Sequence, residues 1–327
     1  MRIAVLNYED AVSTCVTGPA DILISAARMY PFLTGKPQQM ELELDFIKQA
    51  EGHLWKNTFG ASEQNVLNSD EVYNLVIIPA MRFNKIDSVI EKEAGLIEWI
   101  KQQHKRGADV ASICIGAFIL AATGLLDGKK ATTNTMFAGQ FRKMYPLIEM
   151  EEDKIIVDQG HIYSCGGAFS FTTFMIYIIE KFYGHEVAVT TSKMLMINMH
   201  QLPQSTFSIF QFQYNHADDL IKKAQLFIEQ NYKEMISVEK LAAQYNMSNR
   251  NFVRRFELAT SNTPLEYLQR VRVEAAKKLF ENTNEGIEQV ALECGYEDMG
   301  FFRKIFKRHV SMTPREYQKK YGHYEFD

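Results

Sequence analysis

Apolar residues recur at steps of three and four along residues 263–283, which predicts a long amphipathic helix in the carboxyl-terminal third of the chain. Thr263 suits the N-cap position and Pro264 suits the first helical turn. The apolar stripe consists of Leu265, Leu268, Val271, Ala275 and Leu279. The basic residues Arg270, Arg272, Lys277 and Lys278 are expected to point away from this stripe.

A near-copy of one pattern stands on each side of this helix. Residues 238–256 and 287–306 each contain an apolar pair, a tight turn and a polar, basic segment that begins at Ser248 or Asp298. The repeat continues beyond these segments, because Thr-Pro-Leu-Glu-Tyr at 263–267 recurs as Thr-Pro-Arg-Glu-Tyr at 313–317. Two short helices around a tight turn are typical of a helix-turn-helix unit. The linking helix would be roughly 30 Å long, close to the ~34 Å between successive major-groove faces of B-DNA.

Strands and helices alternate through residues 1–185, which predicts an α/β domain with a parallel sheet and helices on both faces. The expected strands are 2–6, 41–47, 75–79, 109–113, 130–133 and 161–165, and the expected helices are 18–29, 86–104, 116–125, 137–144 and 168–182. The sequence has no Gly-x-Gly-x-x-Gly and no Walker motif, so no nucleotide cofactor is expected.

One stretch of this domain has the pattern of a nucleophile elbow. The strand at 109–113 runs directly into a helix, with Cys114 at the corner and the small residues Ser112 and Gly116 on either side. Small neighbours are needed because the backbone approaches itself at such a corner. A thiol at the positive end of the helix is expected to have a lowered pKa. The alternative, that Cys114 is only a small buried residue, stays open.

The composition of the chain limits the classes of protein to which it can belong. A chain of 327 residues with 46% hydrophobic content is typical of two globular domains. The formal charge of −4 does not mark a nucleic-acid binder, but basic residues cluster locally at Arg250, Arg254 and Arg255 and again at Arg303, Lys304, Lys307 and Arg308.

The amino end lacks the pattern of a signal peptide, and the most apolar run, 111–126, is too short to span a bilayer. Cys15, Cys114, Cys165 and Cys294 have no metal-ligand spacing, so we expect a cytoplasmic protein without a metal and without membrane contact.

Residues 217–321 resemble the AraC-type double helix-turn-helix domain throughout. The segment 290–321, VALECGYEDMGFFRKIFKRHVSMTPREYQKKY, resembles the carboxyl-terminal signature of that family in its glycine, its aromatic positions and its closing Pro-Arg-Glu-Tyr. The resemblance implies an all-α domain that binds double-stranded DNA and regulates transcription.

Residues 1–195 resemble the PfpI-type, class I glutamine amidotransferase-like domain of GlxA-type AraC regulators. The elbow, Gly124–Gly128 and Ala131–Thr133 carry this resemblance, which implies a flavodoxin-like fold. Three positions depart from the pattern. Ile115 stands where hydrolytic relatives have His, Asn134 stands where GlxA-type members often have His, and Cys15 stands roughly where some relatives have an acidic partner for the elbow Cys. We therefore assign no catalytic residue.

Two functions from different classes follow from this pattern. The first is a transcription regulator whose amino-terminal domain senses an effector, and the second is a thiol hydrolase fused to a DNA-binding domain. Nucleophilic catalysis by Cys needs a base within hydrogen-bonding distance, and only His53 or His161 is a candidate to approach the elbow in space. The sequence favours the regulator.

The domain boundaries are predicted as 1–198 for the sensor and dimerisation domain, 199–219 for a linker and 220–321 for the DNA-binding domain. The linker aromatics Phe207, Phe210, Phe212 and Tyr214 are spaced too closely for a solvated coil. We expect them to pack on one of the two domains.

The DNA-contacting residues are predicted from the outward positions of the second helix in each helix-turn-helix unit. They are Asn249, Arg250, Asn251 and Arg254 in the first unit, and Met299, Gly300, Phe301, Arg303, Lys304 and Lys307 in the second. The first unit has more side chains that can hydrogen-bond to base edges.

An effector pocket is predicted where the carboxyl ends of the strands converge, since open α/β sheets bind ligands there. Its candidate residues are Cys15, Ala80, Met81, Arg82, Cys114, Ile115, Gly116 and Cys165. The resemblance implies small nitrogen compounds as the class of effector.

We expect the chain to form a homodimer through residues 1–195, because pairing raises the effective concentration of DNA-binding domains at an operator. Sedimentation at micromolar concentration checks this expectation, and a monomer both with and without DNA would contradict it.

Overall fold

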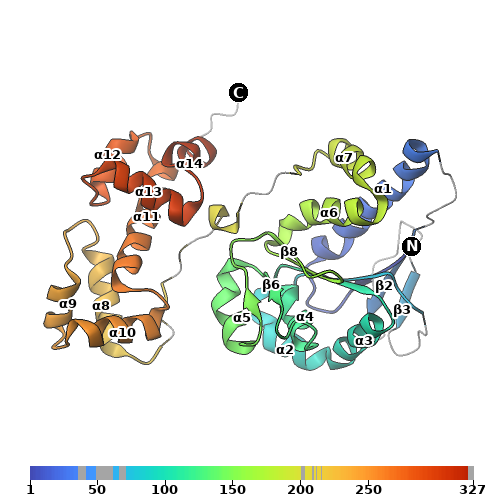
Figure 1. The fold of residues 1–327 in the computed structure, drawn as a ribbon, viewed down its shortest axis with the longest axis horizontal. Coiled ribbons are helices and arrows are strands. Elements are labelled where there is room, and N and C mark those ends of the chain that lie inside the picture. Colours follow the sequence, from blue (N-terminus) through green and yellow to red (C-terminus); the bar gives the residue numbers. More distant parts are fainter. Residues whose placement is uncertain are drawn as a thin grey trace. The chain divides into compact units, whose positions relative to one another are not determined.

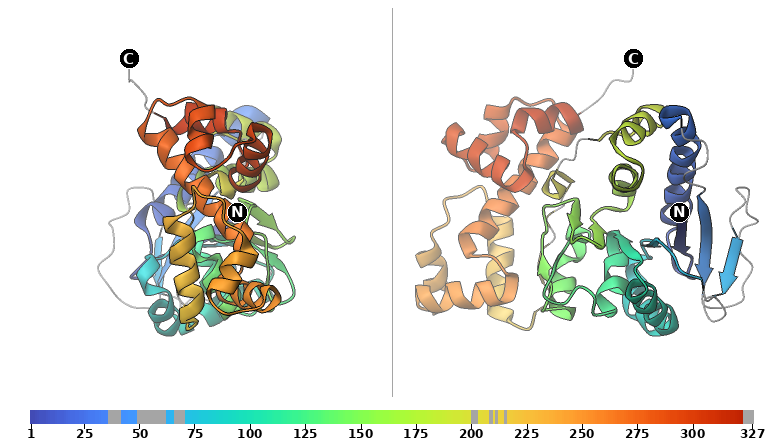
Figure 2. Two further views of the ribbon diagram at one scale, coloured as in Figure 1. Left: turned by 90° about the vertical axis from the view of Figure 1, so that its left-hand side faces the viewer. Right: turned by 45° about the vertical axis from the view of Figure 1, so that its right-hand side comes forward.

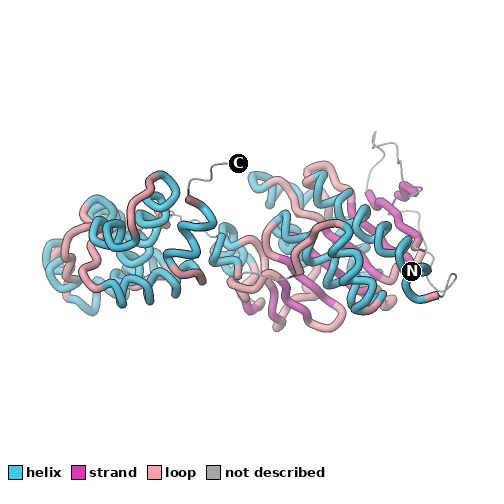
Figure 3. Tube along the Cα trace, turned by 90° about the horizontal axis from the view of Figure 1, so that it is seen from above, coloured by secondary structure: helices cyan, strands magenta, loops and turns pink. Residues whose placement is uncertain are grey.

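The structure, a computed structural model, describes residues 1–35, 42–48, 62–65, 71–199, 203–207, 210, 212–214 and 216–322. The chain divides into two compact units, Met1–Gln204 and Ser205–Asp327 (Figure 1). All the strands lie in the first unit, and the described residues of the second form only helices and loops (Figure 3). No helix among the described residues is long and apolar enough to cross a membrane.

A seven-stranded sheet forms the centre of the first unit, in the order β3-β2-β1-β4-β5-β9-β8. Its strands are β1 (Arg2–Leu6), β2 (Glu43–Lys48), β3 (Ser62–Asn65), β4 (Leu75–Ile78), β5 (Asp109–Ile113), β8 (Ile156–Asp158) and β9 (Ile162–Cys165). All neighbouring strands pair in parallel except β8, which runs antiparallel to β9. This arrangement confirms the predicted α/β fold class, and it brings the carboxyl ends of β1, β4, β5 and β9 to one edge of the sheet.

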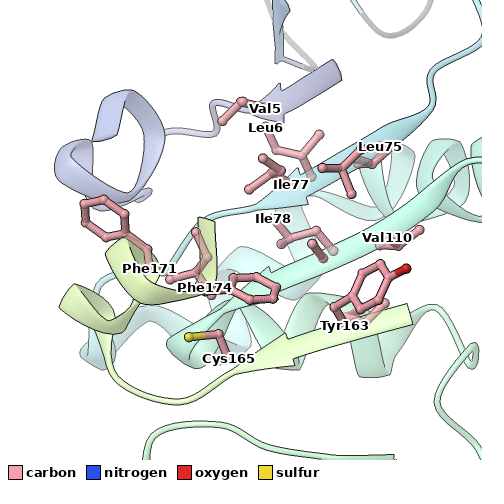
Figure 4. Packing of buried hydrophobic residues seen from close by; sticks show 14 of the residues in the cluster. Val5, Leu6, Leu75, Ile77, Ile78, Val110, Tyr163, Cys165, Phe171 and Phe174 are labelled. Atoms are coloured by element: carbon pink, nitrogen blue, oxygen red, sulfur yellow. The ribbon is translucent and has the colours of Figure 1, made fainter. Parts of the chain in front are cut away.

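Helices cover both faces of this sheet (Figures 1 and 2). One layer contains α1 (Ser13–Thr34), α6 (Phe171–Tyr183) and α7 (His185–Met194), and the other contains α2 (Ile86–Lys92), α3 (Ala94–Lys105), α4 (Ala117–Ala122) and α5 (Ala138–Met144). The residues of β4 and β5 are buried along their whole length, as expected for strands covered on both sides. Figure 4 shows part of this core, in which Phe174 of α6 lies near Cys165 of β9 and Phe171 points toward α1.

Several predicted elements differ from the observed ones. The helix expected from Gly18 begins earlier, at Ser13, so Cys15 lies in the first turn of α1 and not in a loop. Gly18 continues the helix because its missing side chain leaves room for the ring of Phe171, whose Cζ would be 2.4 Å from a Cβ. The single helix expected at 86–104 is interrupted at Glu93, which ends α2 and caps α3.

The segment predicted as a strand at 130–133 also differs. Only Lys130–Ala131 (β6) is a strand, and it pairs with β7 (Glu149–Met150) in a separate two-stranded sheet. Thr132 and Thr133 leave this strand and are fully buried. The elements β3, β7, β8 and α7 were not predicted, because they are short or lack a clear hydrophobic period.

The second unit contains seven helices among its described residues. They are α8 (Asp219–Gln230), α9 (Val238–Gln244), α10 (Asn249–Thr260), α11 (Pro264–Asn282), α12 (Ile287–Glu293), α13 (Met299–Val310) and α14 (Pro314–Tyr321). The predicted linking helix is confirmed as α11, with Thr263 and Glu266 forming a capping box and Pro264 in the first turn. The same capping box recurs at Thr313 and Glu316.

The internal repeat is visible in the backbone as well as in the sequence. Asn246 and Gly295, in the turns of the two helix-turn-helix units, have positive φ angles of 55° and 80°. Ser261 and Ser311 end α10 and α13 in the left-handed conformation, with φ angles of 57° and 59°. Asn and Gly tolerate positive φ better than other residues, which explains their choice at the turns.

Helix α11 contributes to two separate hydrophobic cores. Its first half buries Tyr267, Leu268 and Val271 with α8, α9 and α10, and its second half buries Val273, Ala276 and Phe280 with α12, α13 and α14. The predicted stripe is therefore only partly right. Leu265 is 52% exposed, whereas Tyr267 and Phe280 are fully buried and were not predicted.

Two of the basic residues of α11 that were expected to point away from the apolar stripe make contacts within the second unit. Lys277 is only 5% exposed and pairs with Glu274 at 2.9 Å. Arg272 donates to the carbonyl oxygens of Tyr232 and Glu234 at 2.7 and 2.9 Å, and its guanidinium lies 5.1 Å from the ring centre of Tyr296. Arg272 thus ties the loop before the first helix-turn-helix unit to the turn of the second.

Candidate functional site

The predicted elbow forms directly at the carboxyl end of β5. Cys114 has a φ of 55°, a left-handed conformation that costs a residue with a Cβ on the order of 1–2 kcal/mol. The Thr133 hydroxyl donates to the Cys114 carbonyl oxygen at 2.8 Å and so holds this conformation. A Cβ on Gly116 would lie 2.4 Å from the carbonyl oxygen of Pro79, which confirms that this flank must be small.

Cys15 lies close enough to Cys114 to contribute to the raised pKa of its thiol, and Cys114 contributes in turn to the raised pKa of Cys165. All three thiols are buried. Burial raises the pKa of the Cys114 thiol to about 11, because the thiolate would lose its hydration. Hydrogen bonds from the Ile115 N–H and the Asn134 side chain favour the thiolate but offset only part of this effect. The expectation of a lowered pKa is therefore wrong, since desolvation outweighs the start of the short helix.

No histidine among the described residues is in a position to activate this thiol. Asn134 occupies the neighbouring position, and an amide cannot accept a proton as a general base. His161 lies at the start of β9, where its Nδ1 is 2.7 Å from Oδ1 of Asp109. Asp109 begins β5 and Cys114 follows the end of that strand, so the two positions are separated by roughly 13–16 Å. His53 lies outside the described residues.

The predicted pocket residues are brought to the same edge of the sheet, but they differ in exposure. Cys15, Ala80, Met81, Cys114, Ile115, Gly116 and Cys165 are buried, whereas Arg82 is exposed. Cys15 lies against the Ala80 N–H and its Sγ is 3.7 Å from the Ala168 carbonyl oxygen. Met81 forms an isolated bridge with Ala11. The start of α1 therefore contacts both the segment that follows β4 and the segment that follows β9.

Four of the ten residues predicted to contact DNA lie on α10. Asn249, Arg250 and Arg254 are exposed, and Asn251 is half-buried with its Oδ1 3.2 Å from Nη2 of Arg254. Arg255 belongs to a different environment. Its guanidinium donates to both carboxylate oxygens of Asp218, at 2.8 and 2.7 Å, and thereby fixes the start of α8.

The corresponding face of α13 is more apolar near its start and more basic further along. Gly300, Phe301, Arg303, Lys304 and Lys307 are exposed, and Met299 is half-buried. Arg308 reaches Glu266 of the α11 capping box at 3.6 Å. The two helices therefore present different chemistry from equivalent positions, hydrogen-bonding groups on α10 and an exposed phenyl ring with cations on α13.

The linker aromatics pack on the second unit. Phe210 lies 5.4 Å from the ring of Tyr267 and 5.7 Å from the guanidinium of Arg270, and its ring contacts Phe212 at 5.7 Å. The Tyr214 hydroxyl bonds to Glu229, which also accepts a 2.6 Å hydrogen bond from Tyr267. Phe210 is half-buried, whereas Phe207, Phe212 and Tyr214 remain exposed. The expectation that these rings pack on a domain is therefore confirmed for Phe210 and only in part for the other three.

Sequence reasoning missed Gln204. It is 6% exposed, and its side-chain amide reaches Thr132 and Thr133 beside the elbow. A single glutamine in a polar segment gives no signal of such a role.

Two family models match the chain, the DJ-1/PfpI family over residues 45–181 and a helix-turn-helix domain over residues 241–320. The transcriptional regulator CdhR of Pseudomonas aeruginosa is 24% identical over 68% of this chain and 66% of its own length. The transcriptional regulator GlxA of Rhizobium meliloti is 25% identical over 68% of this chain and 69% of its own length. The alignment with GbdR of Pseudomonas aeruginosa spans only 60% of that relative. The chain joins a DJ-1/PfpI domain to an AraC-type helix-turn-helix domain.

Among solved structures, a transcriptional regulator protein of Vibrio parahaemolyticus is 21% identical, with a TM-score of 0.49 over 60% of this chain and 98% of that chain. The relatives that align with 68% of this chain are named HTH-type transcriptional regulators, which is consistent with a GlxA-type AraC regulator.

Replacing Gly116 by Ala tests the packing of the elbow. The added Cβ would meet backbone oxygens of Pro79 and Ile78 at 2.4 and 2.8 Å, so we expect a loss of about 2–3 kcal/mol in the free energy of unfolding. Gly139→Ala, in α5, is the control, because no atom lies within 4 Å of its added Cβ. Urea unfolding of both variants measures the difference, and equal stabilities would contradict the close approach.

Alkylation of Cys114 tests the state of its thiol. With a pKa of about 11 in place of 9.0, about one molecule in a thousand is a thiolate at pH 8, so alkylation should be roughly 100-fold slower than for an ordinary thiol. The rate should rise about tenfold per pH unit up to pH 10. Iodoacetamide labelling followed by peptide mass spectrometry measures it, with Cys114→Ser as the control. A rate that levels off near pH 7 would show an activated thiol.

Proposed function

We propose that this chain is a sequence-specific DNA-binding transcription regulator, controlled by a small molecule that binds its DJ-1/PfpI domain. The observation that supports this most strongly is the pair of helix-turn-helix units on a shared helix. Each unit presents an exposed polar or basic face on its second helix, α10 or α13, and α11 sets the distance between them. At 1.5 Å per residue α11 is roughly 28 Å long, which suits two neighbouring segments of the major groove.

The two units are proposed to have different roles on DNA. Arginine can bind guanine with two hydrogen bonds and asparagine can bind adenine in the same way. Arg250, Arg254 and Asn249 offer these groups on α10. On α13, Phe301 suits a thymine methyl group, while Arg303 and Lys307 suit phosphates. We therefore propose that the first unit provides most of the sequence specificity and the second provides shape recognition and affinity.

The effector is proposed to bind at the edge of the sheet beside Cys114. Ligands of open α/β sheets bind beyond the carboxyl ends of the strands, and the segments after β4, β5 and β9 meet there. The class of effector suggested by the GlxA-type resemblance is a small nitrogen compound.

Pairing of two chains through the first unit would present two DNA-binding units to one operator.

The alternative, a thiol hydrolase, has less support. A catalytic cysteine needs a thiolate and a base, whereas Cys114 has a raised pKa and an amide neighbour. The DJ-1/PfpI domain also occurs in enzymes, so a direct assay is needed. Hydrolysis of amides or esters that is lost in Cys114→Ala would favour the enzyme.

Arg250→Ala and Arg254→Ala test the assignment of base reading. Each substitution should weaken binding to the operator by about 1–3 kcal/mol, roughly 5- to 150-fold, and should change non-specific binding much less. The operator is first selected from random DNA with the full chain, and both affinities are then measured by anisotropy at fixed salt.

Two controls accompany these variants. Arg28→Ala removes one exposed positive charge from the first unit and should leave operator affinity unchanged. Lys307→Ala should weaken operator and non-specific DNA about equally and should reduce the salt dependence. Equal losses on both DNAs for Arg250→Ala and Arg254→Ala would refute the proposed division of roles.

A thermal-shift screen of small nitrogen compounds on the full chain tests the effector site. Compounds that raise the unfolding midpoint of the wild type and of Cys114→Ser should have no effect on Cys114→Trp, because the indole would fill the site. If Cys114→Trp folds and responds with an unchanged midpoint concentration, the ligand binds elsewhere.

A further inference from the structure

The side chain of Gln204 lies in a polar socket of the first unit. Its Nε2 is 2.9 Å from the Thr132 hydroxyl oxygen, 3.0 Å from the Thr133 carbonyl oxygen and 2.9 Å from the Lys154 carbonyl oxygen. Its backbone N–H donates to the Asp153 carbonyl oxygen at 3.0 Å. Three acceptors therefore converge on one nitrogen, and the backbone of the same residue is fixed as well.

Two neighbouring residues, Gly166 and Thr132, accommodate the side-chain amide of Gln204. A Cβ on Gly166 would lie 2.3–2.5 Å from all three atoms of the Gln204 carboxamide, so a glycine is needed to leave room for it. Thr132 is fully buried, and its hydroxyl donates to the Lys154 carbonyl oxygen at 2.8 Å, which leaves its lone pairs for the amide. The socket is thus specific for a planar group with N–H donors. Buried acceptors of this kind favour a matching donor and disfavour a group that lacks one.

The socket is also connected to the elbow. Thr133 donates its hydroxyl to the Cys114 carbonyl oxygen, and its own carbonyl oxygen accepts from Gln204. Gly166 directly follows Cys165, whose neighbour across the sheet is Ile113. A donor in the socket is therefore linked to the Cys114 carbonyl oxygen through Thr133, by one hydrogen bond to its carbonyl oxygen and one from its hydroxyl.

We propose that this socket is a carboxamide-binding site, which the chain fills with its own Gln204 and for which a free ligand with a primary carboxamide competes. Gln204 is the last residue of the first unit and Ser205 is the first residue of the second. Displacement of Gln204 would therefore release the chain at the point where it leaves the sensor domain. This proposal rests on the proposed function and specifies its effector site as one that recognises a primary amide.

Chemical rescue of the full chain tests the proposal. Gln204→Ala removes the atoms that acetamide, CH3–CO–NH2, would replace. We expect the unfolding midpoint of the first unit to fall by roughly 5 °C and to be restored by acetamide at about 10–100 mM. Acetate has no N–H donor and N,N-dimethylacetamide has none either, so neither should restore it.

Gln204→Met is the matched control, because it fills the socket without a donor. It should lose stability and should not respond to acetamide, and the wild type should not respond at these concentrations. If Gln204→Ala does not fold unaided, the refolding yield in acetamide compared with acetate provides the same comparison. Equal shifts of all three proteins by all three compounds, or no rescue of Gln204→Ala, would overturn the proposal.

DNA binding of the same samples separates this proposal from the function on which it rests. A wild type that prefers no DNA sequence would refute the regulator even if acetamide rescues Gln204→Ala. A wild type that binds its operator, together with a Gln204→Ala variant that acetamide does not rescue, would refute only the carboxamide site.

Discussion

The DNA-binding unit depends on one helix being shared by two hydrophobic cores. Tyr267 packs edge-to-face on Phe256 at 5.3 Å, and Phe280 packs on Phe306 at 5.8 Å, so each half of α11 completes a different core. Because helices rarely bend sharply without a proline or glycine, the two helix-turn-helix units are fixed at the spacing that α11 provides. Arg272 adds a second connection between them through Tyr232 and Tyr296. Arg272 is half-buried in this connection and Lys277 is buried beside Glu274, so neither residue belongs to the exposed faces of α10 and α13.

The first unit keeps the backbone of a catalytic elbow around a thiol that is poorly suited to catalysis. The left-handed conformation of Cys114 is costly, and it persists because the surrounding chain fixes it. Gly116 allows the backbone to approach Pro79 closely, where a Cβ would clash. Catalysis would need a thiolate, whereas burial, with a smaller contribution from Cys15, raises the pKa of the Cys114 thiol. A rigid corner with buried backbone N–H and carbonyl groups beside it is, however, compatible with the small-molecule binding proposed for this unit.

How much could be predicted from sequence depended on the range of the interactions. The repeat, the caps at Ser248, Asp298 and Thr263, and the strand at 109–113 are local patterns, and the structure confirms them. The prediction for the thiol of Cys114 failed because burial is a tertiary property. Tyr267, Lys277 and Gln204 were missed or misjudged for the same reason. The burial of each depends on contacts distant in sequence: Tyr267 with Glu229, Lys277 with Tyr317 and Gln204 with Thr132, which are 38, 40 and 72 residues apart. Local sequence patterns predicted the helix-turn-helix architecture well and the interior of the first unit poorly.

The charge distribution sets how such a protein can approach DNA. Its formal charge of −4 gives no net long-range attraction to a polyanion. The cations that we propose to contact DNA, Arg250, Arg254, Lys304 and Lys307, are exposed on α10 and α13. Because ions screen charges beyond about 8 Å at physiological salt, such groups attract phosphates only at close range. On the proposed function, both helices would therefore have to face the duplex before base reading begins, and the spacing along α11 would allow them to do so together.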